Sequence, residues 1–227
     1  EVDALIADKK MKKDDAIFNV LREYIKDSKR IRFEGDGYGQ AWEDEAAKRG
    51  LSNHKTTPQA LKAKVSKQAI ELYEQLGIMS KVEIEARHEI EVEEYAKRIQ
   101  IEGRILGDIA RNHVIPTAIR YQNILIENVQ GLKDIYGEGF KKIAAEQMSL
   151  IEQISGHIEH INKGITQMIE ARKKANTLDD MEACAFAYCN EVKPLFDDIR
   201  YHCDKLELLV DDELWPLVKY RELLFTR

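Results

Sequence analysis

Hydrophobic residues recur at helical spacing along most of the chain, most clearly after residue 80. In the stretch 138–176 the isoleucines are spaced by alternating threes and fours, the pattern of a coiled-coil-like seam. The stretch 179–210 carries a similar apolar stripe, whereas 80–136 shows two stripes and should lie between neighbouring helices. Short links at Gly137–Gly139 and Thr177–Asp180 join these long helices. The pattern predicts an all-α fold, an antiparallel bundle of long helices.

Local signals set the ends of these helices. Ser80 with Glu83 three residues later forms a capping box, which predicts a helix start. Pro116 interrupts the pattern that follows, and this break could supply a fourth helix. Pro194 should kink the last long helix.

A shorter helical segment precedes the bundle. Asp14 and Asp15 open a helix whose apolar positions include Phe18 and Leu21, because negative charge stabilises a helix N-terminus. The glycine-rich stretch Gly35–Gly39 predicts a turn, and a short helix over 42–48 follows. The polar, turn-rich residues that end at Pro58 mark the expected boundary between 1–57 and 58–227.

The first residues also carry an amphipathic stripe, formed by Val2, Leu5 and Ile6, with no capping residue ahead of it. We therefore expect the chain to begin inside a helix that continues into a longer polypeptide.

Composition supports the helical interpretation. Among 227 residues there are only 12 Gly and 4 Pro, too few for a β-sandwich or barrel. The net charge of −6 argues against binding to nucleic acid or to an anionic membrane. No apolar run is long enough for a transmembrane helix, and the N-terminus lacks a secretory signal. Three cysteines without CxxC spacing favour a reducing compartment, so we expect a cytoplasmic protein.

Two motifs invite chemical interpretations that the surrounding residues oppose. The stretch Gly35–Gly39 could cradle a phosphate, but Glu34 and Asp36 would repel an anion, and no buried strand precedes it. Glu85 and His88 have the Glu-x-x-His spacing of di-iron bundles, yet only one copy occurs where two are needed. The simpler interpretations are a turn for Gly35–Gly39 and a solvent-facing charged helix surface for Glu85 and His88.

The remaining histidines suggest a site only in combination. His157 and His160 flank the isoleucine seam as surface residues, and two imidazoles alone do not make a zinc site. His113, His202 and Glu102 fall in register with apolar seams, so they could form a metal or pH-sensing cluster, or simply be satisfied core residues. We assign no catalytic, cofactor-binding or metal-binding residue from the sequence.

Several separated blocks nevertheless resemble, in the right order, the C-terminal part of type III glutamine synthetases. They are Ser28–Tyr38 with Lys48–Asn53, then Glu85–Glu91, Asn112–Asn123 and Lys219–Phe225. The resemblance implies a parent enzyme that uses ATP and Mg²⁺ to join ammonia to glutamate and that forms homo-oligomeric rings. The family's catalytic motifs belong to an upstream domain and do not occur here.

The resemblance therefore implies a division of labour. Residues 1–57 would be the helical end of the catalytic domain, and 58–227 the C-terminal bundle domain. The chain would be inactive alone, with no cofactor of its own, and its partners would be its own catalytic domain and neighbouring subunits. The alternative is a stand-alone helical bundle that acts as an interaction or sensor module.

Overall fold

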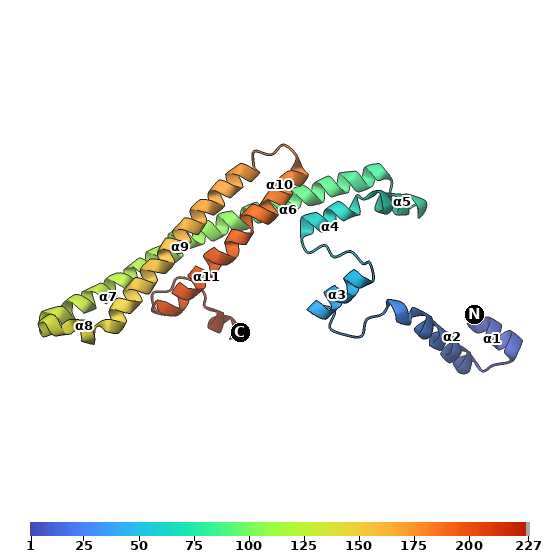
Figure 1. The fold of residues 1–227 in the computed structure, drawn as a ribbon, viewed down its shortest axis with the longest axis horizontal. Coiled ribbons are helices and arrows are strands. Elements are labelled where there is room, and N and C mark those ends of the chain that lie inside the picture. The colour runs from blue at the N-terminus through green and yellow to red at the C-terminus, as the bar shows by residue number, and fades with distance from the viewer. Residues whose placement is uncertain (226–227) are drawn as a thin grey trace. The chain divides into compact units, whose positions relative to one another are not determined.

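The computed structural model describes residues 1–225, so residues 226–227, the end of the predicted segment 58–227, lie outside the described part. Every regular element among the described residues is a helix, which confirms the all-α prediction (Figure 1). The chain divides into two units, Glu1–His54 and Lys55–Arg227.

The first unit consists of short helices with little core. They are α1 (Val2–Lys9), α2 (Lys13–Asp27), a 3₁₀ turn (Ser28–Ile31) and α3 (Gln40–Lys48). The side-chain carboxylate of Asp36 accepts a hydrogen bond from the backbone N–H of Tyr38, so the glycine-rich stretch is a local turn as predicted. Only Ala16 and Ala46 are buried hydrophobic residues in this unit. The apolar stripe of α2 is therefore largely uncovered.

The second unit contains the long helices. In chain order they are α4 (Thr57–Lys64), α5 (Lys67–Gln75), α6 (Lys81–Ile109), a π-helical turn (Ala110–Val114), α7 (Ile115–Tyr136), a 3₁₀ turn (Gly137–Gly139), α8 (Phe140–Ile143), α9 (Ala145–Ala175), α10 (Met181–Ala187), a second π-helical turn (Tyr188–Val192), α11 (Pro194–Leu209) and α12 (Tyr220–Leu223). The predicted capping box forms at Ser80 and Glu83 and opens α6.

The two prolines do not end their helices. Each lies two residues after the end of a π-helical turn, in which a backbone N–H bonds to the carbonyl five residues earlier, as that of Lys193 does to Tyr188 at 2.9 Å. The proline ring disfavours the α-helical geometry of the turn before it. This turn widens instead of breaking. Thus α6 continues into α7, and Pro116 starts no separate fourth helix.

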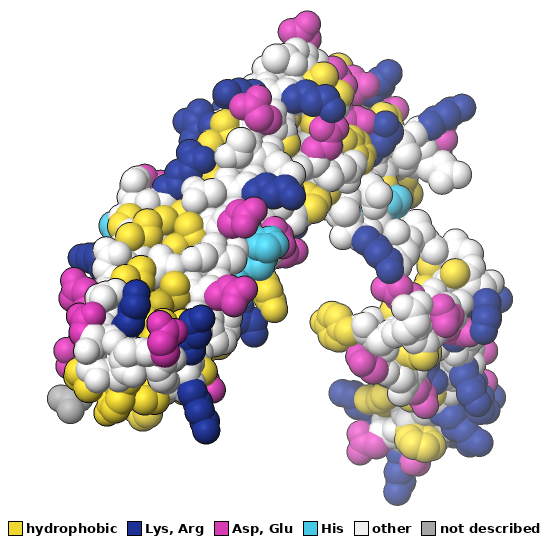
Figure 2. Space-filling view, turned by 60° about the vertical axis from the view of Figure 1, so that its left-hand side comes forward, with side chains coloured by type: hydrophobic (Ala, Val, Ile, Leu, Met, Phe, Trp, Pro, Cys, Tyr) yellow, Lys and Arg dark blue, Asp and Glu magenta, His cyan; other side chains and the backbone are white. Residues whose placement is uncertain are grey.

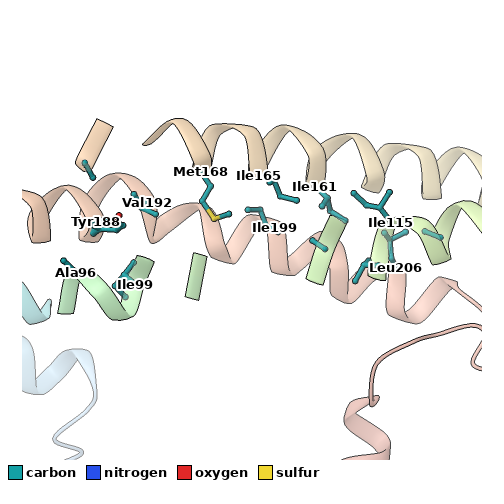
Figure 3. Packing of buried hydrophobic residues seen from close by; sticks show 14 of the residues in the cluster. Ala96, Ile99, Ile115, Ile161, Ile165, Met168, Tyr188, Val192, Ile199 and Leu206 are labelled. Atoms are coloured by element: carbon teal, nitrogen blue, oxygen red, sulfur yellow. The ribbon is translucent and has the colours of Figure 1, made fainter. Parts of the chain in front are cut away.

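The long helices pack as two hairpins that share α9. α9 lies along α7, to which short helical turns connect it, and also along α11, so it runs antiparallel to both (Figure 1). Figure 3 shows Ile165 and Met168 on α9 directed toward Ile199 on α11, and Ile161 on α9 on the side of Ile115 and Leu206. Ile161 and Ile199 are fully buried in this seam. The bundle core thus comes from the predicted isoleucine stripe.

Candidate functional site

Three histidines converge where α9 packs against α11. The Nδ1 atoms of His157 and His202 lie 2.8 Å apart. The His160 ring stacks on the His202 ring with centroids 4.4 Å apart, and Tyr201 meets the same ring edge-on. The Nδ1 atom of His160 lies 2.8 Å from the Gly156 carbonyl. This histidine cluster (His157, His160 and His202) is the densest gathering of titratable rings in the described bundle.

The geometry of the cluster requires a defined protonation state. Two facing nitrogens at hydrogen-bond distance need one donor and one acceptor. Burial lowers the pKa of His157 and of His202 below the usual value of about 6.5, and the neighbouring imidazoles act in the same direction. Lys205 also lowers the pKa of His157, whereas Asp198 opposes the shift at His202. The folded protein therefore favours neutral rings.

This preference predicts a pH-dependent stability. Because the folded pKa values lie below the unfolded ones, the stabilisation is present above about pH 6.5 and is lost as the pH falls through that value toward the folded pKa values. The melting temperature should fall between pH 7.5 and 5.5 more steeply in the unsubstituted chain than in a His157→Gln/His202→Gln variant. His113→Gln is the control and should keep the steep dependence. The same change of melting temperature with pH in the unsubstituted chain, the double variant and the control would contradict the prediction.

His113 and Glu102, which the sequence suggested as partners of His202, do not belong to the histidine cluster. His113 and Glu102 are both exposed, so His113 is not the core residue that its register suggested. The two lie eleven positions apart along one continuous rod, about 16 Å at the rise of an α-helix. Among the described residues, no group of three His, Cys, Asp or Glu side chains is arranged to hold a metal ion. The proposed site at His113, His202 and Glu102 is not formed.

Glu85 and His88, which share the Glu-x-x-His spacing, also lie in different environments. Glu85 is exposed and pairs with Lys81 at 3.6 Å, whereas His88 is buried, with its Nε2 atom 3.5 Å from a carboxylate oxygen of Glu182. Glu182 also accepts a hydrogen bond from Lys62 at 2.6 Å. His88 therefore lies at the contact between α6 and α10. Its burial differs from the solvent-side position that its charged neighbours suggested.

A partly buried polar network, centred on the buried Tyr188, lies at the end of the bundle near the link 177–180. The Tyr188 hydroxyl donates to the Asn176 side chain at 2.6 Å and accepts from Gln100 at 2.9 Å. The network connects α6 to the link and to the second π-helical turn. Sequence reasoning took Tyr188 only as an apolar stripe residue, because nothing local marks Gln100 as its partner.

None of the described cysteines or tyrosines with a shifted pKa is activated as a nucleophile. Burial raises the pKa of the Cys203 thiol to about 12 and also raises that of Cys184. Burial, with Cys189 nearby, raises the pKa of the Tyr95 hydroxyl. These groups stay protonated near neutral pH, and a protonated thiol is a poor nucleophile.

Large apolar side chains remain exposed outside the core, where they lie among charged groups (yellow in Figure 2). The stripe of α6 and α7 that was predicted to face a second neighbour is mostly uncovered: Ile101 is 55% and Ile126 is 47% exposed. No helix among the described residues is both long and apolar enough to cross a membrane.

Comparison with known proteins agrees with the blocks seen in the sequence. The family model described as glutamine synthetase C-terminal domain matches residues 16–133. A glutamine synthetase of Bacteroides fragilis (strain YCH46) is 44% identical over 216 residues, which cover 95% of this chain and 30% of that protein. A type-3 glutamine synthetase of Dictyostelium discoideum is 31% identical over 93% of this chain and 29% of its own length.

A glutamine synthetase of Butyrivibrio fibrisolvens is 28% identical over 91% of this chain and 29% of its own length. The chain thus spans less than a third of the curated relatives that it matches. The resemblance to the C-terminal part of type III glutamine synthetases is confirmed, and the chain belongs to the glutamine synthetase C-terminal domain family.

Proposed function

We propose that this chain is the C-terminal helical part of a glutamine synthetase, where it braces the catalytic domain and supplies packing surface for assembly of a homo-oligomeric ring. The observation that carries the proposal is the uncovered apolar face of α2. Phe18 is 65%, Leu21 53% and Ile25 54% exposed. An amphipathic helix is stabilised mainly by burying its apolar face, so such a face needs a partner.

The long-helix unit supports the same proposal. Ile101 and Ile105 lie four residues apart, on the side of α6 away from the buried Gly103 and Gly107. Such exposed apolar groups on a rod that already has its own core favour contact with another protein surface. In this proposal the surface belongs to the upstream part of the same polypeptide or to neighbouring subunits; the relatives, which extend far beyond the matched region, support it.

In this proposal, 1–57 is the helical end of the catalytic domain and 58–227 the C-terminal domain. The parent enzyme joins ammonia to glutamate with ATP and Mg²⁺ in the cytoplasm. In this proposal ATP and Mg²⁺ bind to the upstream part of the parent polypeptide. The isolated chain is inactive, and ATP-dependent glutamine formation by it would contradict the proposal.

The α2 face gives a direct test of assembly. In the whole parent polypeptide, Leu21→Glu should shift the sedimentation coefficient toward smaller species and lower glutamine synthesis tenfold or more, because a charge replaces an apolar contact in the assembly. In the 227-residue chain alone, the same change should leave the free energy of unfolding within about 0.5 kcal/mol, since Leu21 is exposed.

The neighbouring exposed residue Arg22 provides a matched control, and Arg22→Gln should leave assembly unchanged. Full assembly and activity of Leu21→Glu would refute the structural role. The coding sequence upstream of Glu1 distinguishes this proposal from the alternative, a stand-alone bundle. An initiator methionine immediately before Glu1 would favour an independent interaction or sensor module.

A further inference from the structure

A groove in the long-helix unit is lined by three arginines. It has a volume of about 290 Å³ and lies between α6 with its following π-helical turn and α9. Arg104 and Arg111 come from the first wall, and Arg172 comes from the second. Met168, Ile165 and Ile169 supply apolar lining. Charged groups on two elements thus surround one small hollow with apolar walls.

Two buried glycines of α6 line the groove and lie close to the neighbouring helices. A Cβ atom at Gly103 would lie 3.1 Å from the Phe196 ring, and one at Gly107 would lie 3.3 Å from the Met168 methyl group. Both contacts are tighter than ordinary packing. A larger residue at Gly107 would meet Met168 on α9, and one at Gly103 would meet Phe196 on α11, so the two buried glycines let both neighbouring helices approach α6 beside the groove.

The three guanidinium groups lack ion-pair partners within the described chain. Arg111 makes only a long hydrogen bond, 3.5 Å from its Nη2 to the Thr166 hydroxyl, and neither Arg104 nor Arg172 pairs with a described carboxylate. Asp108 lies in the same groove, but its carboxylate accepts a hydrogen bond from the Asn112 amide at 2.5 Å. The groove therefore carries three positive charges against one negative charge.

This arrangement contrasts with the preceding turns of the same helix. Lys97 pairs with Glu93 at 2.6 Å and Arg98 with Glu94 at 2.5 Å. Such i,i+4 pairs neutralise an exposed helix face. Around the groove the positive charges stay together, although the chain as a whole is negative at −6. Gathered like charges repel one another, and an anion placed between them removes that repulsion.

We propose that this groove binds a small polyanion whose negative groups are phosphates or carboxylates. Guanidinium groups bind both through paired, charge-assisted hydrogen bonds. The net excess of two positive charges matches an anion with at least two negative charges. The volume, near the lower end for ligand pockets, suits a small molecule whose body contacts the apolar lining. This site is separate from the apolar faces that carry the proposed structural role.

Isothermal titration of the whole parent polypeptide tests the site. Inorganic pyrophosphate probes phosphates and citrate probes carboxylates, both in buffer without divalent metals because each probe chelates them. Each of Arg104→Gln, Arg111→Gln and Arg172→Gln should weaken binding of the preferred probe about tenfold or more, because each removes charge-assisted hydrogen bonds. Arg98→Gln, on the same helix but outside the groove, should bind like the unsubstituted protein.

The outcomes are distinguishable. Preference for pyrophosphate or for citrate assigns the ligand class, and circular dichroism melting checks that each variant is folded. Arg104→Lys keeps the charge without the paired donors and should give intermediate binding. Equal titrations for all variants, or no binding of either probe by the unsubstituted protein, overturn the proposal. If the groove variants instead lose ring assembly while neither probe binds, the groove receives an acidic protein segment and the small-anion proposal is wrong.

Discussion

Replacing Ile161 by aspartate should lower the free energy of unfolding of the long-helix unit by about 4 kcal/mol. Ile161 is fully buried in the seam between α9 and α11, where Ile199 is its equally buried neighbour (Figure 3). The substitution removes the apolar contacts and leaves a carboxylate buried without a partner, which costs several kcal/mol. Thermal and urea unfolding of the 227-residue chain, followed by circular dichroism, measures the loss.

Asn162→Asp is the matched control. It introduces the same charged side chain one position further along α9, where the side chain is exposed. Its effect should stay within about 0.5 kcal/mol. If Ile161→Asp unfolds at the same denaturant concentration as Asn162→Asp, the seam between α9 and α11 is not packed as described.

The seam shows which parts of the fold the sequence can predict. Ile154, Ile161 and Ile165 are buried as their spacing indicates, because helical period alone decides which side chains share a face. The apolar stripe of α6 and α7 that was predicted to face a second neighbour has the same helical period, yet its residues Ile101 and Ile105 are exposed. Periodicity identifies a face that needs a partner, but it does not tell whether the partner lies in the same chain.

Contacts between helices were harder to predict than the helices themselves. His157 and His202 lie about equally far in sequence from the link 177–180, so the antiparallel hairpin places them opposite each other. The register of the hairpin was therefore a usable signal for the histidine cluster, whereas the local surroundings of each histidine were not. The arginine groove left even less signal in the sequence, because its shape depends on how closely Gly107 lets α9, and Gly103 lets α11, approach α6.

The close approach of α9 and α11 at Gly164 predicts a second large effect on the free energy of unfolding. Replacing Gly164 by valine should destabilise the long-helix unit by about 3 kcal/mol. A Cβ atom at Gly164 would lie only 2.8 Å from Cγ1 of Ile199, and both residues are buried. Because Ile199 is held on all sides, relief requires α9 and α11 to separate, and overpacking of this kind costs about 1–3 kcal/mol or more.

Gly156 on the same helix offers the opposite environment, since nothing lies within 4 Å of a Cβ atom placed there. Gly156→Val should raise stability by a few tenths of a kcal/mol, because valine has a slightly better helix propensity than glycine. Helix propensity acts equally at both positions, so the difference between the two variants isolates the steric contact with Ile199. Denaturant melts of both variants measure that difference, and equal midpoints would show that α9 and α11 do not pack this closely at Gly164.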